Sequence, residues 1–299
     1  MVSTNITKIY FRGNEIVALY KGDTLIFKKS GVVPPSPTGK YKIKGTVTKS
    51  SGNTQFNLFY NNGQTVNVKV NKDLTFETDL QEPLTDANAM FRGRSYLETL
   101  DLNALDTSQV TDMSNMFSQS NYLKDIKLSG FNTSKVTIMT GMFKGCSNLT
   151  SLDLSSFDTS NVMYMPSMFM DCSGLTSLDL SNFDTSNVMN MQYMFGWCDT
   201  LVNLYINFET SNVTDYNYFD SIFIRDEKLE NVVGKFEGAK VNLDLRYCPL
   251  TAASAMVFIN GLATVTEQRT LALSATTYDS LTPEQIAIAT SKGWTVTRI

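Results

Sequence analysis

The sequence predicts a mixed α/β fold in which a solenoid of 26-residue repeats is preceded by small β modules and closed by an α/β cap. The first observation is a Met-Phe pair that recurs every 26 positions, with its methionine at Met90, Met116, Met142, Met168 and Met194. The second is a turn-like tetrapeptide with nearly the same spacing, which begins at Leu105, Phe131, Phe157, Phe183 and, one residue early, Phe208. Fixed periods of 20 to 50 residues indicate solenoids, in which each repeat buries its apolar face against its neighbours.

The apolar spacing changes within one repeat. After Val136, apolar residues follow at intervals typical of one helical face, which predicts a short helix or 3₁₀ stretch. These residues are Met139, Met142, Phe143 and Cys146. The following series Leu149, Leu152 and Leu154 ends in the alternation of a short strand. The polar Asp-Thr-Ser-Asn cluster after Phe157 is typical of a capped turn, so each repeat is predicted as strand, turn, short helix and turn.

The residues from Phe157 to Ser181 resemble the BspA-like leucine-rich repeat, the bacterial-surface-antigen type, with the pattern F-D-T-S-N-V-x-x-M-x-x-M-F-x-x-C-x-x-L-T-S-L-D-L-S. The resemblance extends from Leu84 to Glu230 and implies a leucine-rich-repeat solenoid over residues 84–234. Similar proteins are surface adhesins of host-associated bacteria, and others are virion proteins of phages that infect gut bacteria. The resemblance therefore implies binding and not chemistry, because a repeat scaffold takes its ligand from the residues that decorate it.

Residues 1–30 are predicted to form a small β attachment module with strands at Ile9–Phe11, Ile16–Tyr20 and Thr24–Phe27. So short a segment buries too little surface to be stable alone and is expected to dock on a partner. Residues 8–27, which begin with K-I-Y and end with I-x-x-L-Y-x-G-D-T-x-I-F, resemble a short module that begins many tail-associated proteins of gut phages. The alternative is a hairpin that packs on the next domain of the same chain.

The first eight residues lack the charged, apolar and cleavage regions of a secretory signal. We therefore expect a protein that is made in the host cytoplasm and reaches the surface of a virion by assembly. The alternative is a protein of the bacterial cell surface whose signal sequence has been trimmed.

The remaining segments flank the repeats. Residues 31–39 form a proline-rich linker. Residues 40–83 are predicted to form a small antiparallel β domain that is a cap on the first coil or a spacer, and residues 235–299 an α/β C-terminal cap. The predicted strands are 41–44, 55–60, 65–70, 74–80, 242–246, 270–274 and 294–299, and the predicted helices are 251–262 and 282–292, the second starting with the Thr282 N-cap and Pro283.

Composition excludes several functions. The net charge of −4 provides no basic surface for nucleic acid, and no apolar run reaches the roughly 20 residues that span a bilayer. The chain has no histidine, which removes the commonest general base and most zinc sites. A two-carboxylate enzyme stays as a distant alternative, but the aspartates recur with the repeat and suit a structural role. We expect no enzyme, cofactor or metal site, buried reduced cysteines, and methionines that serve core packing.

Binding is predicted on the strand face, where outward side chains form polar rows across neighbouring repeats about 4.8 Å apart. The candidate binding residues are Asp101, Lys127, Asp153, Asp179, Tyr205 and Trp197, with further aromatic candidates at Tyr193, Tyr216 and Tyr218. Aromatic rings among polar groups suit contacts with carbohydrate or protein. The predicted function is that of a non-enzymatic virion protein, tail-associated or fibre-like. Its expected partners are other virion proteins through residues 1–30, a host-cell surface glycan or protein, and further copies of itself; the alternative is a bacterial cell-surface adhesin.

Overall fold

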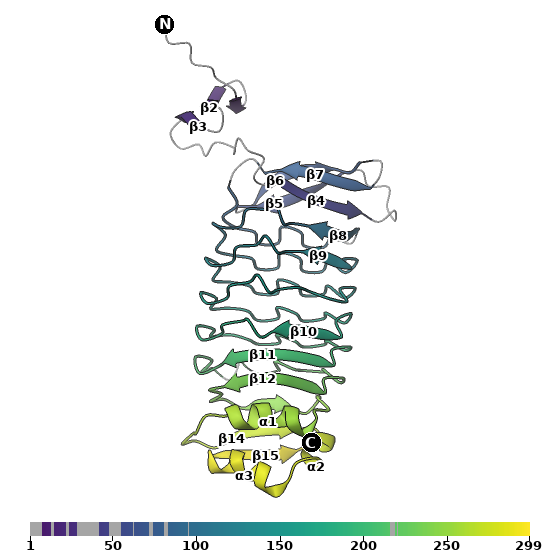
Figure 1. Ribbon diagram of the computed structural model, residues 1–299, viewed down its shortest axis with the longest axis vertical. Coiled ribbons are helices and arrows are strands. Elements are labelled where there is room, and N and C mark those ends of the chain that lie inside the picture. The colour runs from purple at the N-terminus through teal and green to yellow at the C-terminus, as the bar shows by residue number, and fades with distance from the viewer. Residues whose placement is uncertain are drawn as a thin grey trace.

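The structure is a computed structural model that describes residues 8–12, 15–21, 24–28, 42–47, 55–61, 63–71, 74–80, 83–94, 96–215, 219 and 221–299. The described residues form five small sheets and three short helices. Figure 1 shows that most of the chain is a stack of coils along the long axis of the molecule, with the helices at the C-terminal end. The predicted linker at 31–39 lies outside the described residues.

Three short strands near the N-terminus form an antiparallel sheet in the order β1-β2-β3. They are β1 (Lys8–Arg12), β2 (Glu15–Lys21) and β3 (Thr24–Lys28). The three strands predicted from the sequence are therefore confirmed.

Four strands follow, β4 (Lys42–Val47), β5 (Gln55–Tyr60), β6 (Gln64–Lys69) and β7 (Thr75–Asp79). β5 and β6 form a hairpin whose β5 side chains alternate between exposed and buried, as expected for a sheet with one face on the core. β4 pairs with β7 on one side and with β8 (Leu97–Asp101), the first strand of the stack, on the other. This pairing favours a cap on the first coil over a spacer.

Each 26-residue block forms one coil, and successive coils pair in parallel. The strands of the stack are β8, β9 (Asp125–Lys127), β10 (Ser177–Leu180), β11 (Asn203–Glu209) and β12 (Asn231–Glu237). A second ladder of parallel bridges runs through Asp86, Asp112, Ile138, Tyr164 and Asn190. Each coil is thus hydrogen-bonded to its neighbours along two edges.

The core of the stack consists of columns of equivalent residues. Phe143 stacks on Phe169 with 5.9 Å between ring centroids and an interplanar angle of 2°, and the same stacking repeats from coil to coil. Met142, Met168 and Met194 form a neighbouring column that is fully buried. Offset stacking of aromatic rings adds to the free energy gained by burying their apolar area, so neighbouring coils stabilise one another.

The predicted short helix within each repeat is wrong. The segment after Val136 is a run of turns, in which Gly141 has φ +57° and Gly145 has φ +73°. Alternate N–H groups donate to the next coil, as Phe143 N does to Met168 O at 2.9 Å, while the residues between them close local turns. Turns and a helix both direct residues three and four apart to one side, so the apolar spacing could not separate them.

The C-terminal part continues the parallel pairing with helices in place of turns. Its strands are β13 (Leu243–Leu245), β14 (Arg269–Leu273) and β15 (Trp294–Arg298), paired in that order. Its helices are α1 (Ala252–Gly261), α2 (Ala275–Asp279) and α3 (Pro283–Ser291). The N-cap of α3 is Thr282 and Pro283 begins the helix, as predicted, whereas α2 was not predicted. Phe258 of α1 packs against Phe223 and Phe236 of the last coils.

Candidate interaction surfaces

The strand face brings several of the predicted binding residues together. Asp101 of β8 pairs with Lys127 of β9, and their side chains form an exposed ion pair with 3.9 Å between Nζ and Oδ2. Asp179 of β10 pairs with Tyr205 of β11, whose side chain is 40% exposed. Asp153 is also exposed, in a coil whose strand segment has no regular pairing. The strand face therefore presents charged, polar and aromatic side chains in adjacent coils.

The aspartates of this face have a structural role in their own coils. Asp153 Oδ1 accepts hydrogen bonds from the Ser155 N–H at 3.0 Å and from the Ser155 hydroxyl at 2.7 Å. Asp179 Oδ1 accepts from the Ser181 N–H at 2.9 Å, and Asp101 Oδ1 accepts from the Asn103 N–H at 3.1 Å. These contacts are Asx turns that end each strand. The hydrogen bonds from Ser155 lower the pKa of the Asp153 carboxyl, because they favour its ionised form.

Trp197 does not lie on the strand face, contrary to the prediction. It belongs to the run of turns, where its backbone N–H donates to Ile224 O at 2.9 Å and its φ is +61°. Tyr193, at φ +57°, lies beside it with 6.1 Å between the ring centroids. Bulky residues rarely adopt positive φ, so residue type does not indicate turns at these two positions. Tyr216 and Tyr218 lie outside the described residues.

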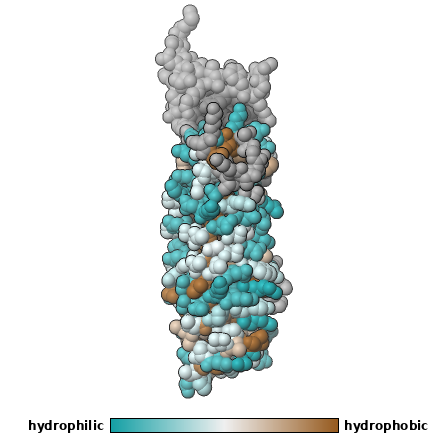
Figure 2. Space-filling model, turned by 90° about the vertical axis from the view of Figure 1, so that its right-hand side faces the viewer, coloured by the Kyte–Doolittle hydropathy of each residue, from teal (hydrophilic) through white to brown (hydrophobic). Residues whose placement is uncertain are grey.

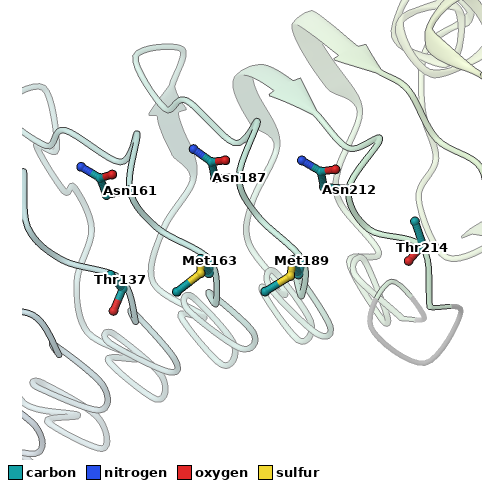
Figure 3. Close-up of a pocket in the computed structure, with 7 residues that line it drawn as sticks. All are labelled: Thr137, Asn161, Met163, Asn187, Met189, Asn212 and Thr214. Atoms are coloured by element: carbon teal, nitrogen blue, oxygen red, sulfur yellow. The ribbon is translucent and has the colours of Figure 1, made fainter.

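A shallow groove crosses several coils on another face and was not found from the sequence. It has a volume of about 620 Å³ and runs along the stack between a row of asparagines and a row of threonines and methionines (Figure 3). We call it the amide groove; its lining residues are Thr137, Asn161, Met163, Asn187, Met189, Asn212 and Thr214. The asparagine row and the Thr/Met row stand two positions apart in each coil and flank a buried valine, such as Val162.

The asparagine amides of the groove are fixed by contacts between coils. Asn161 Nδ2 donates to Ser134 O at 2.8 Å, Asn187 Nδ2 donates to Ser160 O at 2.8 Å, and Asn212 Nδ2 donates to Ser186 O. Figure 3 shows the three amides in a row with the same orientation. Repeated contacts of this kind hold side chains at defined positions without a ligand.

The methionines of the groove differ from the core methionines. Met163 is 36% exposed, although Met165 two positions later is fully buried. In the earlier coils the column of Met163 and Met189 holds a threonine, as at Thr111 and Thr137. The signal that could have identified the groove is therefore the pair Met163 and Met189, which are 26 positions apart but outside the core offsets. Over the face drawn in Figure 2, by contrast, hydrophilic residues predominate and hydrophobic ones form separate small patches.

The cysteine thiols, which could support redox or metal chemistry, are buried. The four cysteines are free and buried, and three of them form a column in which each thiol donates to a phenylalanine carbonyl of the preceding coil, as Cys172 Sγ does to Phe143 O at 3.1 Å. Burial raises the pKa of the Cys146 thiol to about 12. Within the part of the chain that the structure describes, no three His, Cys, Asp or Glu residues are grouped as metal ligands.

Asp226 occupies the coil after Cys198 and is also buried. Its Oδ1 accepts a hydrogen bond from the Cys198 N–H at 3.0 Å, and its Oδ2 has no partner among the described residues. Burial raises the pKa of this carboxyl well above its usual range.

No helix among the described residues is long and apolar enough to cross a membrane.

Comparison with known families identifies one match. A family model described as "Mycoplasma protein of unknown function, DUF285" matches three overlapping ranges, residues 57–151, 85–203 and 123–236. Together these ranges span the coils of the stack and more than half of the 299 residues. Curated proteins and solved structures gave no match.

Proposed function

The chain belongs to this DUF285 family of Mycoplasma proteins of unknown function, and from its geometry we propose that it is a non-enzymatic binding protein. In this proposal the stack is a BspA-like leucine-rich-repeat solenoid whose strand face recognises a partner. The observation that carries the proposal is the register that places Asp179 beside Tyr205 and Asp101 beside Lys127. This register aligns exposed groups of several coils into one surface.

The chemistry of the strand face supports binding. Its carboxylates are held by their own turns and stay exposed, so a partner meets side chains that are already ordered. Pre-ordered groups lose little conformational entropy on binding. Tyr205 adds an exposed ring beside the Asp179 carboxylate, a combination that suits a glycan or a protein surface.

We further propose that the protein is part of a phage virion, as a tail-associated or fibre-like component. The support is the resemblance of the repeats and of residues 8–27 to proteins of gut phages, together with the three-strand sheet that residues 8–28 form. In this proposal residues 1–30 attach the protein to other virion proteins and the stack reaches toward the host cell, which it contacts through a surface glycan or protein. A homo-oligomer is compatible with a fibre-like component.

The second candidate is a bacterial cell-surface adhesin, which the bacterial-surface-antigen repeat pattern favours. The test is quantitative mass spectrometry of purified phage particles. In parallel, it measures the peptides that a protease releases from the surface of intact bacterial cells of the same culture. The virion proposal expects peptides of this protein to copurify with the particles at a fixed ratio to a tail protein. Peptides released from the cell surface and absent from the particles would instead support the adhesin.

A further inference from the structure

The amide groove offers a periodic row of hydrogen-bond acceptors. The Nδ2 groups of Asn161, Asn187 and Asn212 are used by carbonyls of the preceding coils. Their Oδ1 atoms accept no hydrogen bond from the residues that the structure describes, and in Figure 3 they point along the stack in the same direction. Since an amide oxygen has two lone pairs, each coil offers one acceptor site, repeated at the spacing of parallel strands of about 4.8 Å.

The other wall of the groove is apolar in its central part. Met163 and Met189 form this part, with Thr137 and Thr214 at the two ends. Thioether side chains are polarisable and adapt to irregular apolar surfaces. A ligand in the groove thus meets hydrogen-bond acceptors on one side and methyl and methylene groups on the other.

The groove carries no charge, which restricts its ligand. None of its seven lining residues is ionisable. Lys135 continues the asparagine row toward the N-terminus, but its ammonium group donates to Gln109 Oε1 at 2.9 Å, one coil further away. Uncharged ligands therefore match this surface better than phosphates, acidic peptides or basic peptides.

The spacing of the acceptors distinguishes between two uncharged ligands. An extended peptide that follows the stack directs an N–H group to the same side at every second residue, which is about 6.8 Å. This distance does not match the coil spacing of about 4.8 Å. In a linear polysaccharide of β-linked pyranose rings, each ring lengthens the chain by nearly the spacing between two coils. Each ring also offers hydroxyl donors and a face of C–H groups.

We propose that the amide groove binds an uncharged linear polysaccharide that runs along the stack, with one sugar ring per coil. Hydroxyl groups of successive rings donate to Oδ1 of Asn161, Asn187 and Asn212, and the C–H faces pack on Met163 and Met189. This site goes beyond the proposed function, because it lies outside the strand face and does not depend on that face or on a virion.

The test is isothermal titration calorimetry of the full chain with two uncharged series, cello-oligosaccharides and N-acetylated chito-oligosaccharides, of two to six rings. The proposal expects the Kd for at least one series to fall from two to four rings and then to level off, since the groove crosses four coils, from that of Thr137 to that of Thr214. It also expects a Kd that does not change between 50 and 500 mM salt, because screening acts only on charged partners. No binding of either series at millimolar concentration, or a Kd independent of chain length, would overturn the proposal.

Variants locate the site. Asn187→Ala removes one acceptor and should raise the Kd roughly 3- to 10-fold, the range for one lost hydrogen bond. The double variant Met163→Glu with Met189→Glu places charges on the apolar wall and should raise the Kd by at least about 10-fold. Unchanged Kd values for both variants would show that the sugar binds elsewhere and would overturn the proposal.

A matched control separates binding from folding. Asn148 is exposed and its Nδ2 donates to Asn121 O at 2.6 Å, a contact between coils outside the groove. Asn148→Ala should lower the unfolding midpoint about as much as Asn187→Ala and leave the Kd unchanged. Neutralising Asp153 and Asp179 should also leave the Kd unchanged. The proposal for the groove and the proposal for the strand face can therefore be refuted independently.

Discussion

The Thr133 hydroxyl joins two coils by binding both backbone groups of Asp158. Its Oγ1 donates to Asp158 O at 2.8 Å and accepts from the Asp158 N–H at 2.8 Å. The equivalent Thr107 makes both contacts with Asn132, and Thr185 makes both with Glu209. Because these threonines are only 1% exposed, water cannot replace the hydroxyl, and the contact fixes the register of neighbouring coils.

Replacing this hydroxyl should destabilise the stack. Thr133→Val keeps the shape of the side chain but leaves the N–H and C=O groups of Asp158 without their partner. The expected loss is about 1 to 3 kcal/mol in the free energy of unfolding, the range for buried groups that lose a hydrogen bond. Urea denaturation measures it. The control Thr133→Ser retains the hydroxyl, so an equal loss in both variants would contradict the proposed role.

The leucines of the strand segments should differ in their contributions. The sequence predicts one core column for Leu152, Leu178 and Leu204; Leu178 and Leu204 are buried at 2% and 0% exposure, whereas Leu152 is only partly buried. Leu178→Ala should cost about 2 to 5 kcal/mol, as for buried leucines in general, and Leu152→Ala should cost less. Thermal and urea unfolding of both variants test this order, and a larger loss for Leu152→Ala would contradict the described packing.

The buried Asp226 carboxyl should make stability depend on pH. Its folded pKa is raised by burial, whereas in the unfolded chain an aspartate titrates near 3.9. Its contribution is therefore fully present below about pH 4 and is lost as the pH rises toward the folded pKa. In that window one proton changes the free energy of unfolding by at most about 1.4 kcal/mol per pH unit.

Asp226→Asn isolates this effect. The amide can still accept from the Cys198 N–H and cannot ionise, so the variant should be more stable than the unmodified protein at pH 7 and should lack its part of the pH dependence. Asp125→Asn, at an exposed carboxyl several coils away, serves as the control and should change neither. Identical pH profiles for the protein and Asp226→Asn would show that Asp226 is ionised in the fold.

The cysteines should be reduced and unreactive in the folded protein. All four are buried and free, and burial raises the pKa of each thiol, so that thiolate is scarce at neutral pH. Alkylation should label none of them quickly in the folded state and all four after denaturation without a reductant. Intact-mass spectrometry counts the labels, and two or no labels in the denatured protein would reveal disulfides.

The sequence predicted strands and helix starts better than turns. Strands such as β5 and the N-cap at Thr282 follow from alternation and from capping chemistry, which act locally. The runs of turns were mistaken for helices because their left-handed positions hold residues as different as Gly145, Asp171 and Trp197. Only the contact of each residue with the next coil explains this conformation, and a single sequence does not show that contact.

The same limit applies to the candidate sites. The rows of the strand face could be predicted, because a period of two within each strand and of 26 between coils determines which side chains are adjacent. Trp197 is aromatic, but its register within the repeat does not place it in a strand. The amide groove is harder to predict. Its methionines, Met163 and Met189, are the same residue type as the core methionines and differ from them only in their position within the repeat. The leucine-rich-repeat assignment and the virion role stay predictions.

If the strand face recognises the host, its substitution should change how fast phage particles adsorb to their host cells. The particles should carry Asp153→Asn, Asp179→Asn and Tyr205→Ala together. Asparagine retains the oxygen that caps each turn, and exposed substitutions usually change stability by less than about 0.5 kcal/mol, so folding and assembly should be preserved. The variant protein should be incorporated normally into particles, and the adsorption rate of these particles should fall at least about 10-fold. Normal incorporation with an unchanged adsorption rate would contradict recognition by the strand face.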